Sequence, residues 1–449
     1  ALEESTDPGE APTDPGEDPT TPPADEITPI AEIQGTGSAT PLNGQKVTTE
    51  GYVTAVYATG GFNGFYLQTE GTGGTHDGEA SHGIFVYAGN NSALDSLEKG
   101  QFLRVTGTAG EYYGLTQLTN PTWTAEEAPE TAVAPVPVTI DVLPDGDAAR
   151  EKYEGMLIAI EGDYTITDNY NTNRYGELGL APGLEPLLQP SQVYNPTEHP
   201  AEIAALDEYN KNARVNLDDG MSWDLTRFNQ NNDLIPVAYL NVNDPARVGA
   251  QVDFLQPMVL DYRNDSWKIQ PTEPINLPGA DDPDNYVDNT DQWVAFVNNE
   301  RPAAPSDLGS DVTLATFNVL NYFTTTGDDW GCSNGYQDRD GNYITANNCD
   351  PRGAFPDYDL ERQEQKIVAA INELDASVVG LEEIENSVRF NKDRDQALND
   401  LVAALNADAE YTKWAAVASP TNVPAGEDVI RLAYIYQPDV VQPVGESKI

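Results

Sequence analysis

Residues 314–322 read Leu-Ala-Thr-Phe-Asn-Val-Leu-Asn-Tyr, and residues 378–386 read Val-Val-Gly-Leu-Glu-Glu-Ile-Glu-Asn. Each stretch is a short apolar run that ends on polar residues able to bind a metal ion or a phosphate. Between them, residues 360–374 carry apolar side chains at helical spacing, which predicts an amphipathic helix. The strand, helix, strand order indicates an α/β unit with Asn318 and Glu383 at the ends of its two strands.

The chemistry expected at these strand ends is phosphate binding through a metal ion. A carboxylate beside an amide from a neighbouring strand is suited to hold a divalent cation that neutralises a phosphoryl oxygen. The alternatives are structural, because an asparagine at a strand end is usually a turn former and Glu383 could be a helix N-terminal carboxylate. Spacing alone leaves both interpretations open. A predicted helix at 395–405 and a predicted strand at 431–436 continue the α/β alternation.

Net charge is the outlying property of the chain. Its 449 residues hold 23 basic and 74 acidic side chains, a net charge of −51. This charge repels nucleic acid and anionic membranes at long range. One interpretation of the negative charge is solubility in a salty or extracellular medium. The other is that clustered carboxylates bind divalent cations, which then mediate contact with an anionic substrate. The sequence contains no run of 18 or more apolar residues, so no membrane span is predicted.

The chain before residue 311 is predicted to be accessory. Residues 1–28 are a disordered, acidic, Pro-rich spacer. Alternating apolar and polar runs predict an OB-fold-like β-barrel at 29–124 and, after a linker at 125–137, a second β-rich OB-like module with an insertion at 138–275. Residues 276–310 are predicted to be an acidic linker.

These modules do not have the composition of a nucleic-acid groove. Aromatic side chains that could stack on bases are Phe62, Phe65, Tyr66, Tyr112, Tyr113, Tyr170 and Tyr175. An OB groove for nucleic acid should be basic, and this part of the chain is strongly acidic, so core and rim packing is the favoured interpretation. The three histidines, His76, His82 and His199, are expected to be surface polar residues.

The two cysteines, Cys332 and Cys349, lie in a loop rich in Gly, Asn and Asp. Such a pair suits a disulfide, worth roughly 3 kcal/mol through loop entropy, and it indicates a location outside the cytoplasm. In the same loop, residues 338–342 space oxygen atoms as calcium loops do, but the glycine is misplaced and no glutamate follows at the twelfth position. A tight acidic turn is therefore the preferred interpretation.

Four motifs carry a family resemblance. They are Thr316-Phe317-Asn318-Val319-Leu320-Asn321-Tyr322-Phe323, Arg362-Gln363-x-x-Lys366-Ile367-Val368-Ala369-Ala370-Ile371, Gly380-Leu381-Glu382-Glu383-Ile384-Glu385-Asn386 and Leu432-Ala433-Tyr434-Ile435-Tyr436-Gln437-Pro438. Together they closely resemble secreted bacterial deoxyribonucleases of the endonuclease/exonuclease/phosphatase family. The resemblance implies a deoxyribonuclease I-like four-layer α/β sandwich, with Asn318 contacting the scissile phosphate and the metal, and Glu383 binding the metal. It implies Mg²⁺, with Ca²⁺ or Mn²⁺ as alternatives, and DNA, with RNA as the alternative substrate. Two small departures are the acidic Glu382 before Glu383, and Phe355 after the Arg352-Gly353-Ala354 run, where an acidic or amide residue is usual.

One departure from the family is large. Three features of the family have no counterpart here: its general-base histidine, its Asp-x-Asn pair and its terminal Ser-Asp-His segment. Every histidine of this sequence precedes Pro200. Residues 311–449 are about half of what such a sandwich needs. They are therefore expected to be the N-terminal half of the catalytic domain, inactive alone, in a monomeric secreted protein. The rival hypotheses are a phosphatase or phosphodiesterase acting on nucleotides or lipid headgroups, and a non-catalytic fragment that binds nucleic acid or envelope polymers.

Overall fold

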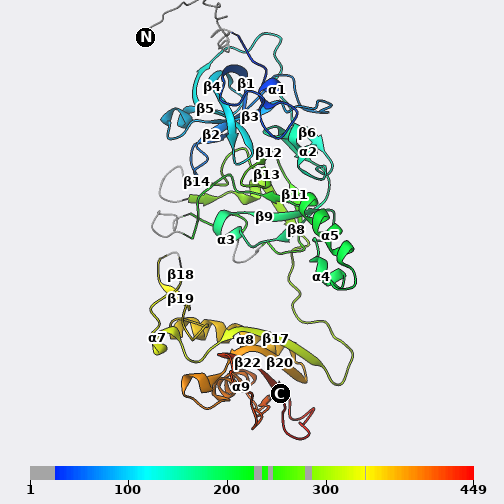
Figure 1. Cartoon of the computed structure of the whole chain (residues 1–449), viewed down its shortest axis with the longest axis vertical. Helices are drawn as coiled ribbons and strands as arrows, with labels where there is room; N and C mark the ends of the chain where they lie inside the picture. The colour runs from blue at the N-terminus through cyan, green and yellow to red at the C-terminus, as the bar shows by residue number, and fades with distance from the viewer. Residues whose placement is uncertain (1–25, 227–234, 241–245, 279–285, 339) are drawn as a thin grey trace, which may run out of the picture. The chain divides into compact units, whose positions relative to one another are not determined.

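The computed structural model describes residues 26–226, 235–240, 246–278, 286–338 and 340–449. The chain divides into two compact units. Unit 1 comprises Ala1–Asp224 with Leu234–Asn299, and unit 2 comprises Leu225–Asp233 with Glu300–Ile449. Figure 1 labels many of the elements of both units. Most of the predicted 1–28 spacer lies outside the described residues, as does much of the acidic run near Asp281.

Unit 1 begins with a closed five-stranded barrel. Its elements are α1 (Ile30–Gln34), β1 (Lys46–Tyr57), β2 (Gly64–Gln68), β3 (Gly83–Tyr87), the 3₁₀ turn η1 (Ser92–Ser96), β4 (Phe102–Tyr112) and β5 (Leu115–Ala125). The strand order is β1-β2-β3-β5-β4, with β4 pairing back onto β1. This small closed barrel is compatible with the OB-like module predicted at 29–124.

A β-bulge in β1 gives the barrel an apolar outer patch. Val53 packs inside the barrel, and the register of β1 against β2 shifts between Val53 and Ala55. A one-residue shift turns the following side chains to the other face of the strand. Ala55 and Tyr57 consequently join an apolar cluster that also includes Val259 of the second module.

The second module of unit 1 is built on a nine-stranded sheet. Its strands are β6 (Val138–Ile140), β7 (Leu157–Ile160), β8 (Tyr164–Asp168), β9 (Leu178–Pro182), β10 (Val215–Leu217), β11 (Gln251–Phe254), β12 (Met258–Tyr262), β13 (Trp267–Gln270) and β16 (Val294–Val297). Their order is β16-β11-β8-β9-β10-β13-β12-β7-β6. Helical segments connect them: α2 (Asp147–Arg150), η2 (Glu151–Tyr153), α3 (Thr172–Tyr175), α4 (Pro190–Val193), α5 (Pro200–Ala213) and α6 (Thr290–Trp293).

The prediction of an acidic linker at 276–310 is wrong for part of this range. A small sheet pairs β14 (Asn276–Pro278) with β15 (Tyr286–Asp288), and β16 adds antiparallel to β11. Trp293 and Val294 are buried in the core of the module. Apolar side chains between acidic residues therefore attach residues 293–297 of this segment to the sheet.

The two modules of unit 1 pack closely on each other. The Tyr57 hydroxyl donates to the Pro271 carbonyl at 2.7 Å, and the backbone amide of Leu157 donates to Gln68 Oε1 at 2.9 Å. A Cβ on Gly83 would lie 2.2 Å from backbone atoms of Gly155, so this crossing requires glycine. Backbone, polar and apolar contacts together make the barrel and the second module one body.

Unit 2 carries the α/β segment predicted from the opening motifs. Its elements are β17 (Leu314–Tyr322), α7 (Gly327–Trp330), β18 (Gly335–Gln337), β19 (Tyr343–Ala346), α8 (Asp357–Leu374), β20 (Val378–Glu385), η5 (Ser387–Phe390), α9 (Gln396–Ala409), β21 (Ala415–Ala416) and β22 (Ile430–Tyr436). The main sheet has the order β17-β20-β22-β21, with β17 and β20 parallel. Helices α8 and α9 and strands β17 and β20 agree with the predicted segments to within a few residues.

One face of this sheet is covered by helices. Ile367 and Ile371 of α8 share a core with Leu398 of α9 and with Val379 and Leu381 of β20. On the other face, Leu314, Leu432 and Tyr434 are exposed by 76%, 68% and 53%. Within the described residues, unit 2 is a sheet with helices on one face, and the four-layer sandwich stays a prediction.

Candidate functional site

Asn318 and Glu383 lie at neighbouring positions on the two parallel strands. In the β17–β20 ladder Asn318 is opposite Glu382, and pairing resumes with Tyr322 opposite Ile384. Glu383 is the single β20 residue within this irregularity. The structure thus brings together the two residues that the sequence singled out, and their role as a site stays a prediction.

The backbone at this point is in an unusual conformation. Leu320, Asn321 and Glu383 have positive φ angles of 49°, 53° and 63°. Left-handed backbone costs a non-glycine residue roughly 1–2 kcal/mol. Such conformations persist where surrounding contacts hold them, and they cluster at functional sites.

Packing and hydrogen bonds hold this conformation. Leu381 and Ile384 are both in the core of unit 2, although three positions apart, so the strand needs a bulge between them. On β17, Asn318 Oδ1 accepts the Leu320 amide at 2.7 Å. Gln363 of α8 donates to the Leu320 carbonyl at 2.7 Å.

The donor set fits part of a divalent-cation site. Glu383 is half-buried, and no hydrogen bond or ion pair engages its carboxylate among the described residues. The Asn318 oxygen keeps one lone pair beyond its bond to Leu320. Magnesium is often held by one or two protein oxygens, with water and phosphate completing the shell. The described residues contain no cluster of three His, Cys, Asp or Glu side chains arranged for a metal, so these two oxygens would be a minority of the ligands.

A pocket of about 550 Å³ opens beside the end of β17. It is bounded by β17, by one face of α8 and by the loop between them. Three cationic side chains line it, Arg352, Arg362 and Lys366, together with the acidic Asp359. Arg362 pairs with Asp359 at 2.8 Å, and Arg352 pairs with Asp428 at 2.9 Å. Asn318 lines this pocket, whereas Glu383 lies outside it.

The loop that forms one wall of the pocket contains the disulfide. Cys332 and Cys349 are bonded, with their Cα atoms 5.9 Å apart, which confirms the predicted pairing. The acidic turn predicted in this loop is also present. Asp338 accepts the amides of Asp340 and Asn342 at 3.0 and 2.8 Å, and its bonds to Asn342 lower the pKa of Asp338. Its oxygens therefore close a turn.

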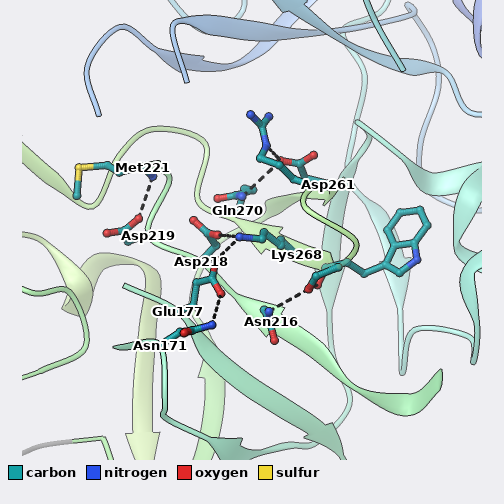
Figure 2. A network of polar contacts seen from close by, with 12 residues as sticks. Asn171, Glu177, Asn216, Asp218, Asp219, Met221, Asp261, Lys268 and Gln270 are labelled. Atoms are coloured by element: carbon teal, nitrogen blue, oxygen red, sulfur yellow. Dashed lines mark hydrogen bonds and ion pairs between the residues drawn. The ribbon is translucent and has the colours of Figure 1, made fainter. Parts of the chain in front are cut away.

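Sequence reasoning missed a buried polar network in unit 1, shown in Figure 2. Lys268 Nζ contacts Asp218 Oδ2 at 2.7 Å and also pairs with Glu177. Parallel pairing of β10 with β13 places Lys268 opposite Asn216, beside Asp218. Burial raises the pKa of Asp218 to about 6, although Lys268 opposes this shift. The ammonium group occupies the space between the carboxylates, so the network is a structural connection within the module.

The signal for this network is weak in the sequence. Lys268 follows Trp267 in a short alternating strand, and alternation predicts a solvent-facing lysine. It is instead 5% exposed, and its ammonium group is paired with the carboxylates of Glu177 and Asp218.

Some of the aromatic residues suggested for base stacking are buried and others are exposed. Phe62, Phe65 and Tyr66 are at most 2% exposed, so these three rings pack inside unit 1. Phe62 also lies 3.9 Å from the Arg263 guanidinium, which is paired with Asp261. Core packing, the favoured interpretation, is therefore right for these three rings. The exposed rings include Tyr112, Tyr113 and Tyr170.

His76 and His82 are half-buried and their rings meet edge to face with centroids 5.4 Å apart, and desolvation lowers the pKa of both imidazoles. Both side chains are less exposed than the predicted surface position implies, whereas His199 is exposed. The His76 ring also contacts the Tyr153 ring of the second module, with the centroids 5.7 Å apart.

Comparisons with known proteins leave the family open. No protein-family model and no curated protein matches the chain. One solved structure, described as "Structure of murine DNA binding protein bound with ds DNA", is 7% identical, with 50% of this chain and 90% of that chain covered and a TM-score of 0.20. Another, "Structural mimicry for functional antagonism", is 11% identical, with 51% and 89% covered and a TM-score of 0.19. Scores this low carry no argument about fold or function.

Among the helices of the described residues, none is long and apolar enough to cross a membrane.

Proposed function

We propose that unit 2 acts on the phosphodiester backbone of DNA, with RNA as the alternative, as part of a metal-dependent hydrolase. The observation that carries the proposal is the unengaged carboxylate of Glu383 beside Asn318, next to a pocket lined by Arg352, Arg362 and Lys366. A bound divalent cation and the cationic side chains of this pocket would both reduce the repulsion between DNA and a chain of net charge −51.

Each residue has a distinct part in this proposal. Glu383 and Asn318 supply oxygens to a Mg²⁺ ion, with Ca²⁺ or Mn²⁺ as alternatives. The bound ion polarises the phosphoryl oxygen and neutralises its charge. The cationic pocket orients the adjoining backbone. Unit 2 contains no histidine, so its part in the proposed reaction is to bind the metal ion and the phosphodiester backbone.

The proposal also includes secretion of the protein. The Cys332–Cys349 disulfide is compatible with an oxidising, extracellular compartment.

The metal part of the proposal is tested first. Mn²⁺ binding is measured by electron paramagnetic resonance for the wild type, Glu383→Gln and Glu373→Gln. Glu373 is an exposed glutamate on α8 and gives the matched control. We expect Glu383→Gln to weaken binding by at least about tenfold, because it removes a charged ligand, and Glu373→Gln to leave it unchanged. Equal Mn²⁺ affinity in both variants would contradict the assignment of the metal.

The chemistry is tested on plasmid DNA with the same variants in the full-length protein. Glu383→Gln is expected to abolish degradation. Undiminished degradation would contradict the assignment of Glu383 as a metal ligand of a nuclease. Product release from DNA, 5′-nucleotides and sphingomyelin separates a nuclease from a phosphatase or phosphodiesterase of the same fold.

A further inference from the structure

We infer that the pocket beside β17 binds one nucleotide of a single strand, with the base on its apolar walls and the adjoining phosphates on its cationic rim. This inference rests on the proposed function and specifies the substrate of that site. It assigns base contacts in addition to backbone contacts.

The rim is built by helical spacing. Asp359, Arg362 and Lys366 follow one another on α8 at intervals of three and four, which places them on one face of the helix. Arg352 comes from the loop on the other side of the pocket. Lys366 is exposed, and within the described residues it has neither a hydrogen bond nor an ion pair. A lysine ammonium left unpaired among other cations is placed to bind an anion.

The walls of the pocket are apolar. They include Phe317 and Val319 of β17, Ile344 of β19, Ala354 of the loop and Ile367 of α8. Ile344 and Phe317 are partly exposed, so apolar surface is accessible inside the pocket. A phosphate alone gains nothing from such walls, whereas the base that the sugar links to that phosphate buries its faces against them.

Size and charge both suit a nucleotide. Small-molecule sites usually measure roughly 300–1,000 Å³, and this pocket measures about 550 Å³. Asp359 pairs with Arg362 and Asp428 pairs with Arg352, so the unpaired charge of Lys366 leaves the rim positive in an acidic chain. The bases of a duplex are stacked and paired, so only an unpaired base can enter.

The experiment compares two labelled strands of equal charge by fluorescence anisotropy. One is the tetranucleotide dT4, and the other is its abasic analogue with the same phosphates. EDTA is present, so binding depends neither on the metal nor on Glu383, and a failed metal assignment does not affect this result. We expect dT4 to bind about fivefold or more tightly than the abasic strand.

Three variants locate the binding within the pocket. Ile344→Gln should remove most of the preference for dT4, because it replaces an apolar wall. Lys366→Gln should weaken both strands and reduce the slope of log affinity against log salt by about 0.7. Lys448→Gln is the matched control, because this exposed lysine lies in a different hollow of unit 2. Melting temperatures confirm that all three variants are folded.

Two outcomes would overturn the inference. A preference for dT4 that persists unchanged in Ile344→Gln places base binding elsewhere on the chain. A salt slope that responds equally to Lys366→Gln and Lys448→Gln shows that the rim does not bind phosphate.

Discussion

Glu154 is a carboxyl group buried between the two modules of unit 1. It is 0% exposed, and its Oε1 accepts the Thr116 amide at 3.1 Å, whereas Oε2 has no partner among the described residues. Desolvation, and then the charge of Glu151, raises the pKa of Glu154 well above its usual value. The neutral form is consequently the one that the fold stabilises.

The sign of the resulting pH dependence follows by linkage. An acid whose folded-state pKa is raised contributes stability below its unfolded pKa, and that stability is lost as pH rises through the folded pKa. Glu151, with its pKa raised to about 7 by burial, acts in the same direction. We expect the wild type to melt at a lower temperature at pH 8 than at pH 5, measured by calorimetry.

Glu154→Gln should reduce that difference, because glutamine mimics the neutral acid at both pH values. The shift corresponds to roughly 2–4 °C for each kcal/mol removed. Glu70→Gln is the control, since Glu70 is an exposed glutamate in the barrel module of unit 1. If Glu154→Gln and Glu70→Gln retain the same pH dependence as the wild type, Glu154 is not the group responsible.

At the residue scale, the sequence predicted some positions and missed others for a physical reason. Asn318 and Glu383 were identifiable because each ends an apolar run, and parallel pairing brings such ends together. Lys268 and Glu154 were not, because their burial depends on which distant strand or module covers them. That information is carried by tertiary packing, which local patterns do not report.

The loop between β17 and α8 is the element that shapes the pocket. It supplies Arg352 and Ala354 to the lining, and the Cys332–Cys349 disulfide closes a 17-residue separation within it. Closing a loop of this size stabilises a fold by about 3 kcal/mol, mainly by constraining the unfolded chain.

Replacing both cysteines by serine should therefore lower the free energy of unfolding of unit 2 by about 2–4 kcal/mol. Urea denaturation measures it, with and without dithiothreitol. Reduction should destabilise the wild type and leave the double variant unchanged. A double variant as stable as the oxidised wild type would show that the closed loop adds nothing to the fold.

Element prediction succeeded where one local pattern was sufficient. The barrel strands β1 to β5 lie at 46–125, close to the range 29–124 in which alternating runs predicted a barrel, and α8 begins only three residues before its predicted start. It failed at β16, where Trp293 and Val294 sit among acidic residues and composition indicated a linker. Pairing with β11 provided the stabilisation that the local sequence did not reveal.

At the scale of the whole molecule, the net charge of −51 opposes compactness. Like charges repel one another in the folded state, and added salt screens them over a Debye length of about 10 Å at 0.1 M. Raising NaCl from about 10 mM to 500 mM should therefore increase the melting temperature of the chain. Because the chain forms two compact units, we expect calorimetry to resolve two transitions, both shifted upward.

Magnesium chloride at matched ionic strength separates screening from binding. Screening alone predicts equal shifts for the two salts. A cation held by Glu383 and Asn318 would add a stabilisation of about 2.7 kcal/mol when its concentration is 100 times the dissociation constant. That increment should appear in the transition of unit 2 and disappear in Glu383→Gln. An equal extra shift in both transitions, or one that survives the substitution, would place the cation on the acidic surface of the chain.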